Sequence, residues 1–365
     1  MISRNSISRR TIQRGITVTV GLSFLCLLAV NLYSSGGDTL KVLRALNTFK
    51  LCWAAAAGLL MLALSWLVEG MRIKVISTLL EENLPLYKII LINLATFFTG
   101  NMTPYTSGGA PTQVYLLHKE GMSLGKASAV VTARIATGTL VFTLGAPVLL
   151  FIFPKVLHLA LFIQIILIIL GAVISGLLIF FLSRPHAAKN LLLTFLALFK
   201  CSKEKQKCSS AECDASDRGK NIFLETNLEA FFKALDEFHL CLTALFHKNK
   251  GLIALILILS SLFWLSFFSI APVILYFLGF KVNFASSILL QYLFIFVAAY
   301  LPIPGGSGVV ELGFLSIFRQ LYVPKNMLGV IITLWRLISF HTNNIVGGVI
   351  FLRLLKDKSP AATRE

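Results

Sequence analysis

Two stretches rich in glycine and proline interrupt an otherwise apolar sequence. The first, GNMTPYTSGGAP, covers 100–111, and the second, YLPIPGGSGVVELG, covers 300–313. Proline lacks an amide donor and glycine leaves helical geometry easily, so we expect both stretches to be unwound. Unsatisfied backbone groups in hydrocarbon are costly, and they are tolerated only inside protein or beside a water-filled cavity. The two breaks are therefore predicted to line a cavity with a binding site.

Two arginines stand alone in long apolar runs. Arg134 is the only formal charge within 127–154, and Arg336 is the only one within 326–352. An arginine at the middle of a membrane helix costs about 2.5 to 3.5 kcal/mol on insertion scales, so each should face the protein interior and have a partner. Glu311 is the natural partner, because it is the only charged residue within 282–318. A guanidinium that binds a phosphate in one state and Glu311 in another would be a switch.

The predicted substrate-binding residues combine these charges with the two breaks. They are Arg134, Arg336, Glu311, Asn101, Pro104, Gly108, Gly109, Pro304, Gly305 and Gly306. Other interpretations stay open: the glycines serve close helix packing, the arginines snorkel or form a structural ion pair, and the polar residues near Pro104 form only a turn. No nucleophile, base and orienting residue recur at a catalytic spacing, and the six cysteines fit no zinc pattern. We therefore expect no enzyme activity, no metal site and no cofactor.

The composition requires a membrane to position these residues. Of 365 residues, 56% are hydrophobic and 13% are charged, and the mean hydropathy is +0.82, which excludes a soluble or a disordered protein. A bilayer crossing needs about 20 apolar residues. The runs that qualify or nearly qualify cover 15–37, 51–68, 89–118, 127–154, 156–183, 251–280, 282–310 and 326–352. We predict an all-α polytopic membrane protein with about eight full transmembrane helices, two Gly/Pro-broken segments and a retained first span.

Charge placement predicts the topology. The net charge of +17 is typical of basic loops held on the cytoplasmic side and not of nucleic-acid binding. We divide the chain into an N-terminal membrane half (1–183), a cytoplasmic linker with an amphipathic helix over 222–246 (184–250), and a C-terminal membrane half with a short tail (251–365). The protein is expected in a bacterial inner membrane, with both termini on the cytoplasmic side. We favour breaks that cross the bilayer over re-entrant ones. With re-entrant breaks, eight spans would put the linker outside, against its charge, whereas breaks that cross return it inside.

The two breaks begin similar units. In each unit a Pro and a Gly-Gly pair precede a short apolar segment, a polar turn and a helix with one arginine; Pro104 precedes Arg134 by 30 residues, and Pro304 precedes Arg336 by 32. The first unit begins near the cytoplasmic Lys88, and the second begins on the opposite side. The units are therefore predicted to be inverted repeats, an architecture that transporters use to form a mid-membrane substrate site.

The segments NMTPYTSGGAPTQVYLLHKEGMSLGKASAVVTAR and YLPIPGGSGVVELG, the second followed by LWR, resemble the flippase-like family related to the membrane domain of lysylphosphatidylglycerol synthases. The resemblance covers roughly 15–352 and implies movement of a polar or charged lipid between leaflets, such as aminoacylated phosphatidylglycerol. It also implies that the predicted site residues of both breaks occupy motif positions of the family. Full-length synthases carry a further soluble domain for which a chain ending at Glu365 has no room, so synthase activity is not expected.

The leading hypothesis is a lipid translocase whose arginine-bearing cavity passes a polar, anionic, aminoacylated or lipid-linked headgroup. Its expected partner is a membrane phospholipid or a lipid-linked substrate; no nucleic acid is expected, and homo-oligomerisation is left open. One alternative is a membrane scaffold for a separate lipid-modifying transferase, with the segment 222–246 as its dock. The other alternative is a secondary transporter of small anions.

Overall fold

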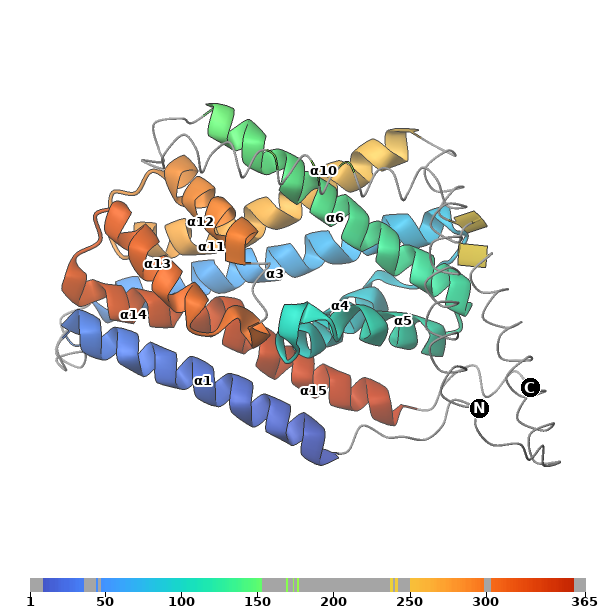
Figure 1. The fold of residues 1–365 in the computed structure, drawn as a ribbon, viewed down its shortest axis with the longest axis horizontal. Helices are drawn as coiled ribbons and strands as arrows, with labels where there is room; N and C mark the ends of the chain where they lie inside the picture. Colours follow the sequence, from blue (N-terminus) through green and yellow to red (C-terminus); the bar gives the residue numbers. More distant parts are fainter. Residues whose placement is uncertain are drawn as a thin grey trace, which may run out of the picture.

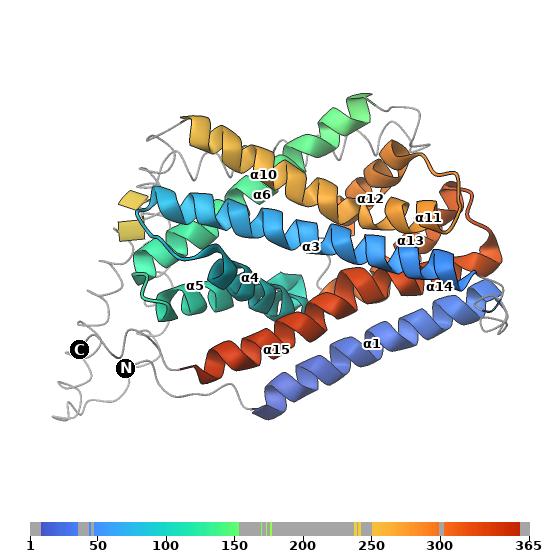
Figure 2. The same ribbon diagram turned by 180° about the vertical axis from the view of Figure 1, so that it is seen from behind.

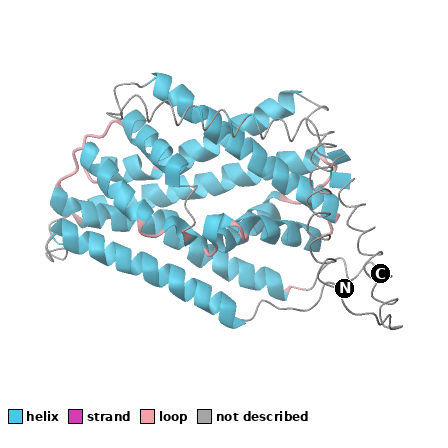
Figure 3. Cartoon of the chain, in the orientation of Figure 1, coloured by secondary structure: helices cyan, strands magenta, loops and turns pink. Residues whose placement is uncertain are grey.

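The computed structural model describes residues 9–35, 47–152, 250–298 and 303–357, with isolated positions at 44, 169, 173, 176, 237–238 and 240–241. Within these residues every regular element is a helix and none is a strand (Figures 1 and 3). The α-helices are α1 (Arg9–Ser35), α3 (Thr48–Leu79), α4 (Leu86–Asn101), α5 (Gly109–Lys119), α6 (Leu124–Ile152), α10 (Lys250–Phe268), α11 (Ile270–Phe277), α12 (Phe284–Ala298), α13 (Val309–Gln320), α14 (Lys325–Arg336) and α15 (Thr342–Lys356).

In the part of the chain that the structure describes, four helical spans are long and apolar enough to cross a bilayer: Thr48–Leu79, Leu124–Gly145, Lys250–Phe277 and Lys325–Lys356. The last of these joins α14 to α15 through a π-helical turn, η3 (Leu337–His341). These spans and the all-helical architecture fit the predicted class of polytopic membrane protein. The number of crossings and the division into two halves stay predictions, since most of the run 156–183 and most of the linker lie outside the described residues.

The first break is the tip of a helical hairpin. Helix α4 leads into a short 3-10 turn, η1 (Pro104–Thr106), and α5 leads back. Lys88, in the first turn of α4, forms an ion pair of 2.6 Å with Glu120, the residue that follows α5. The 16 residues of α4 span roughly 24 Å and the 11 of α5 roughly 16 Å, which is short of a hydrocarbon core of about 30 Å. The expectation that this break crosses the membrane is therefore wrong; the segment enters and returns.

The second break is the tip of a hairpin that enters from the opposite end of the bundle. It consists of α12, the 3-10 turn η2 (Pro304–Gly306) and α13. The stacked rings of Trp53 and Phe277, 6.5 Å apart, place the end of α11 beside the start of α3. A hydrogen bond of 3.1 Å from Arg319 to Tyr33 places the end of α13 beside the end of α1. Figures 1 and 2 show that α12 and α13 both lie in the half of the bundle next to this end. The expectation that the second break crosses the membrane is therefore also wrong.

The re-entrant geometry also corrects the count behind the predicted topology. The eight apolar runs included the two breaks, which do not cross. Without them, the runs 15–37, 51–68, 127–154 and 156–183 precede the linker. An even number of crossings returns the chain to its starting side, so a linker on the same side as the N-terminus needs no crossing by the breaks.

The tips of the two hairpins meet inside the bundle, where η1 contacts η2. Apolar residues of α3, α4, α5 and α6 form one buried cluster around the first hairpin, including Ile73, Ile92 and Leu117. Residues of α1, α3, α11, α13 and α14 form another around the second hairpin, including Phe314 and Ile331. These two cores hold the unwound segments deep between the long helices.

Only four positions of the predicted amphipathic segment 222–246 are described. Glu237 accepts a hydrogen bond of 2.6 Å from the Ser123 hydroxyl at the start of α6. Phe238 and Cys241 pack against the core around the first hairpin, whereas Leu240 is exposed. At these positions the apolar face is covered by the chain's own helices; the remainder lies outside the described residues.

Candidate functional site

The second break has a backbone that requires glycine. Gly305, Gly306 and Gly308 have φ values of +59°, +63° and +92°, which residues with a Cβ rarely adopt. Glu311 lies in the first turn of α13, and its Oε2 accepts a hydrogen bond of 2.6 Å from the amide of Gly308. A carboxylate at a helix N-terminus satisfies an otherwise unpaired amide and interacts favourably with the helix dipole. The sequence therefore stops, unwinds and restarts a helix in the membrane with Glu311 as its cap.

Arg336 pairs with this cap. Its Nε donates to Oε1 of Glu311 at 2.9 Å, and its Nη2 donates to the carbonyl of Gly305 at 2.7 Å. The guanidinium carbon lies 4.0 Å from the centre of the Phe340 ring, a cation–π distance. Arg336 is 4% exposed and Glu311 is 0% exposed, and the hydroxyl of Ser23 reaches Oε1 of Glu311 at 3.4 Å. The expected pairing of Glu311 with a helix arginine is confirmed for Arg336.

The first break is strained and tightly packed. Tyr105 and Thr106 have φ values of +53° and +54°, a left-handed conformation that is costly without glycine and is concentrated at functional sites. The amide of Gly108 donates to the Thr103 hydroxyl at 2.8 Å. A Cβ at Gly109 would lie 3.3 Å from the carbonyl oxygen of a residue on α4. Gly108 and Gly109 therefore let α5 pack closely on α4, which was one of the open interpretations.

A cavity of about 380 Å³ lies where the two tips meet. Both breaks contribute to its wall, and α14 contributes Arg336. The lining residues are Ser65, Trp66, Phe97, Asn101, Tyr105, Thr106, Phe263, Trp264, Phe267, Ile295, Ala298, Ile303, Gly305, Gly306, Val310, Trp335, Arg336, Ser339, Phe340 and Asn343. No Asp or Glu occurs among these described lining residues. The cavity thus combines one cation and a few neutral hydrogen-bonding groups with an aromatic wall.

Four of the predicted site residues line this cavity, namely Asn101, Gly305, Gly306 and Arg336. The amide of Asn101 donates to Oδ1 of Asn344 at 2.8 Å, which ties the first break to α15. Glu311 does not line the cavity itself, but it holds the guanidinium of Arg336, which does. The predicted residues that do not line the cavity are Arg134, Pro104, Gly108, Gly109 and Pro304.

Arg336 is placed to bind an anion. Its Nε and Nη2 are occupied by Glu311 and Gly305, whereas its Nη1 makes no hydrogen bond to a residue that the structure describes. Coulomb interactions strengthen when water is excluded, and a guanidinium matches the geometry of phosphate and carboxylate. The cavity can therefore hold the anionic group of a ligand at Arg336, while the aromatic side chains of the cavity wall contact apolar or planar parts of that ligand.

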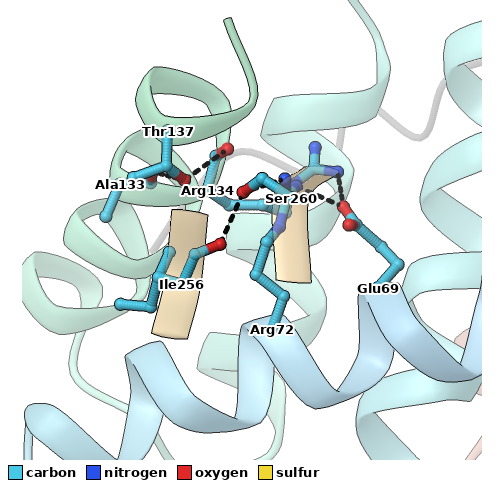
Figure 4. Close-up of polar contacts among 7 residues, drawn as sticks. All are labelled: Glu69, Arg72, Ala133, Arg134, Thr137, Ile256 and Ser260. Carbon is cyan, nitrogen blue, oxygen red and sulfur yellow. Dashed lines mark hydrogen bonds and ion pairs between the residues drawn. The ribbon is translucent and has the colours of Figure 1, made fainter. Parts of the chain in front are cut away.

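Arg134 belongs to a different cluster (Figure 4). Its Nη1 lies 2.9 Å from Oε1 of Glu69, and Nη2 of Arg72 lies 2.6 Å from the same oxygen. Nη1 of Arg72 also donates to the hydroxyl of Ser260 at 3.0 Å. The expectation that Arg134 bears on the cavity with Glu311 as partner is wrong, because Glu69 on α3 is its counter-ion.

Sequence reasoning missed Glu69 and Arg72 because the apolar run 51–68 stops before them, as if the membrane span ended there. Helix α3 instead continues to Leu79, and both residues are buried within it. The available signal was an acidic and a basic residue three positions apart, followed by further apolar residues in IKVISTLL. That spacing places the two charges on one helix face.

Comparison with known proteins adds two similarities. A family model described as the lysylphosphatidylglycerol synthase TM region matches residues 15–347. A protein of Archaeoglobus fulgidus named UPF0104 membrane protein is 28% identical over 295 residues, which covers 80% of this chain and 84% of that protein. The family match includes both breaks, both charge clusters and the cavity.

Proposed function

The chain belongs to the family of the lysylphosphatidylglycerol synthase TM region, and from this premise we propose that it moves a lipid with an anionic headgroup between the two leaflets. The observation that carries the proposal is the cavity between the hairpin tips, with Arg336 in its wall and no described carboxylate facing it. A phosphate crossing a bilayer needs a compensating charge near the middle of the membrane. Arg336 supplies that charge.

The architecture supports the same proposal. Two hairpins that enter from opposite ends and meet at their unwound tips match the inverted repeats and broken helices of many transporters. We propose that the units around Pro104 and Pro304 are such a pair. Helix ends that lie at one end of the bundle (Figure 1) carry lysines, namely Lys88, Lys126 and Lys250 at or near the starts of α4, α6 and α10, and Lys119 at the end of α5. By the positive-inside tendency this end faces the cytoplasm of a cell membrane.

The path of the headgroup follows from the wall of the cavity. Tyr105 lines the cavity and is 59% exposed, so the cavity reaches the protein surface beside the first break. The headgroup enters there and its phosphate binds Nη1 of Arg336, while the acyl chains stay in the bilayer. Glu311 holds the guanidinium when no anion is bound. Exchange between these two partners allows the headgroup to leave again, because a site that binds too tightly would not transport.

Reconstitution into liposomes tests the proposal. A fluorescent phosphatidylglycerol is placed in both leaflets, and a membrane-impermeant quencher reports how fast the inner pool reaches the outside. Wild type should expose the inner pool faster than protein-free liposomes, and Arg336→Gln should lose most of this acceleration. Arg319→Gln is the matched control, since Arg319 hydrogen-bonds Tyr33 at the exposed end of α13.

A small-anion transporter is the competing outcome. Tight binding of inorganic phosphate, with no binding or movement of lipid, would favour it and count against lipid translocation. A scaffold for a separate transferase would be indicated if Arg336→Gln left the cellular phenotype intact while deletion of 222–246 abolished it.

A further inference from the structure

The Glu69 cluster carries more positive charge than an ion pair needs. Two guanidinium groups, of Arg72 and Arg134, share a single carboxylate oxygen of Glu69. Glu69 is 1% exposed and Arg72 is 3% exposed. Among the described residues, these three side chains therefore place one uncompensated positive charge inside the bundle. Burying such a charge is costly, so a purely structural role explains one arginine and not the second.

Several polar atoms around this charge have no partner among the described residues. They are Oε2 of Glu69, Nε of Arg72 and Nε of Arg134. Buried polar groups in native proteins are nearly always hydrogen-bonded, and each exception calls for an explanation. A surplus positive charge next to two unused N–H donors is an arrangement suited to binding an anion.

The cluster lies one helical turn from the cavity along two helices. On α3, Ser65 and Trp66 line the cavity, and Glu69 follows Ser65 by four residues, which is roughly 6 Å along the axis. On α10, Trp264 lines the cavity, and Ser260, which binds Arg72, precedes it by the same four residues. The cavity and the cluster are therefore neighbours inside one bundle.

Phe263 stands between them. Its ring lines the cavity, and the guanidinium carbon of Arg72 lies 5.8 Å from the ring centre. The ring also stacks on Phe97 of α4, with centres 6.4 Å apart. One aromatic side chain thus both lines the cavity and lies within cation–π range of Arg72.

We propose that Arg72 and Arg134 form a second binding station for the phosphate of the headgroup, separated from the Arg336 station by Phe263. This inference rests on the proposed function and deepens it. Displacement of the Phe263 ring opens the way from one station to the other, and the two guanidinium groups then hold the phosphate oxygens by charge-assisted hydrogen bonds. Glu69 keeps the arginines together when the station is empty. Two sites of moderate affinity in series shorten the distance that the charged phosphate travels in each step through the apolar interior.

Binding to the full chain in detergent micelles tests the second station. The probe is dihexanoyl phosphatidylglycerol, titrated by calorimetry, with inorganic phosphate in a parallel series. Wild type should bind two molecules of the probe, Arg336→Gln should bind one, and the double variant Arg336→Gln/Arg72→Gln should bind none. Residual binding in Arg336→Gln that Arg72→Gln leaves unchanged would overturn the inference.

Charge variants make the test independent of simple loss of folding. In the Arg336→Gln background, Glu69→Gln raises the charge of the cluster by one and should tighten residual binding about tenfold, since a unit charge at this range acts strongly in a low dielectric. Glu69→Gln/Arg72→Gln restores the original net charge and should bind within a few fold of the parent. Should Arg72→Gln fail to fold, Glu69→Gln alone decides, because unchanged affinity would contradict the second station.

The outcome is separable from that of the proposed function. Two bound molecules without lipid movement in liposomes would uphold both stations and refute translocation. Lipid movement that survives Arg72→Gln at the wild-type rate, with the number of bound molecules also unchanged, would refute the second station and leave translocation in place. Binding of inorganic phosphate but not of the lipid probe would uphold the anion stations and identify their ligand as a soluble anion.

Discussion

The pairing of Arg336 with Glu311 yields a prediction that separates stability from function. In Arg336→Gln, Glu311 keeps the amide of Gly308 at 2.6 Å and the hydroxyl of Ser23 at 3.4 Å, but loses its only salt-bridge partner among the described residues. A charge left unpaired in a buried ion pair costs about 3 to 5 kcal/mol. The single variant should therefore unfold at clearly lower temperature or denaturant concentration.

The double variant Glu311→Gln/Arg336→Gln removes both charges. Two neutral amides of similar volume carry no unpaired charge, so most of the lost stability should return, to within about 1 kcal/mol of wild type. Lipid movement should not return, because the phosphate still lacks its guanidinium. In this double variant, stability should therefore recover while lipid movement stays lost.

The assay pairs thermal unfolding in detergent with the quenching assay in liposomes, on wild type, both single variants and the double variant. Glu311→Gln alone should keep anion binding, since Arg336 is then released from its internal partner. Recovery of both stability and lipid movement in the double variant would refute the reasoning, because the pair would then be a structural link and not a headgroup site.

Three further predictions follow from the hairpins. Gly305→Ala should destabilise the fold by about 1 to 3 kcal/mol, because a Cβ would lie 2.6 Å from the Phe340 ring at a φ of +59°, whereas Gly21→Ala, with nothing within 4 Å of its Cβ, should be nearly neutral in the same unfolding assay. Single cysteines at 88 and 120 in a cysteine-free background should react with an impermeant thiol reagent from the same side of the membrane, and labelling from opposite sides would restore the crossing interpretation. Asn101→Ala should slow lipid movement severalfold with a loss of about 1 kcal/mol of stability, since it removes both a cavity-lining amide and the 2.8 Å bond to Asn344; an unchanged rate would exclude Asn101 from the site.

Local chemistry in the sequence was enough to predict where the helices break. Pro304 and the glycines that follow it cannot continue a helix, so the unwinding of that segment did not depend on distant contacts. The pairing of Glu311 with a helix arginine could be predicted because charged residues are scarce here: Glu311 is the only one within 282–318. Both are cases in which few alternatives were physically available.

The direction of the chain after each break could not be predicted in this way. A re-entrant hairpin and a broken crossing have the same apolar halves and the same glycines. Only tertiary contacts, such as that of Lys88 with Glu120, distinguish them. The partner of Arg134 was missed for a related reason: Glu69 lay just beyond an apolar run, and its burial depends on how far α3 continues. The aromatic wall contributed by α10 is likewise a result of packing.

The central claim is that an anionic headgroup sits in the cavity at Arg336. Native mass spectrometry of the protein released from mild detergent, with its co-purified lipids, tests this claim most directly. Wild type and Arg319→Gln should retain the same number of anionic phospholipids, and Glu311→Gln/Arg336→Gln, although folded, should retain one molecule fewer. Retention of the same number of anionic lipids by the double variant, or of neutral lipids alone by wild type, would contradict the claim.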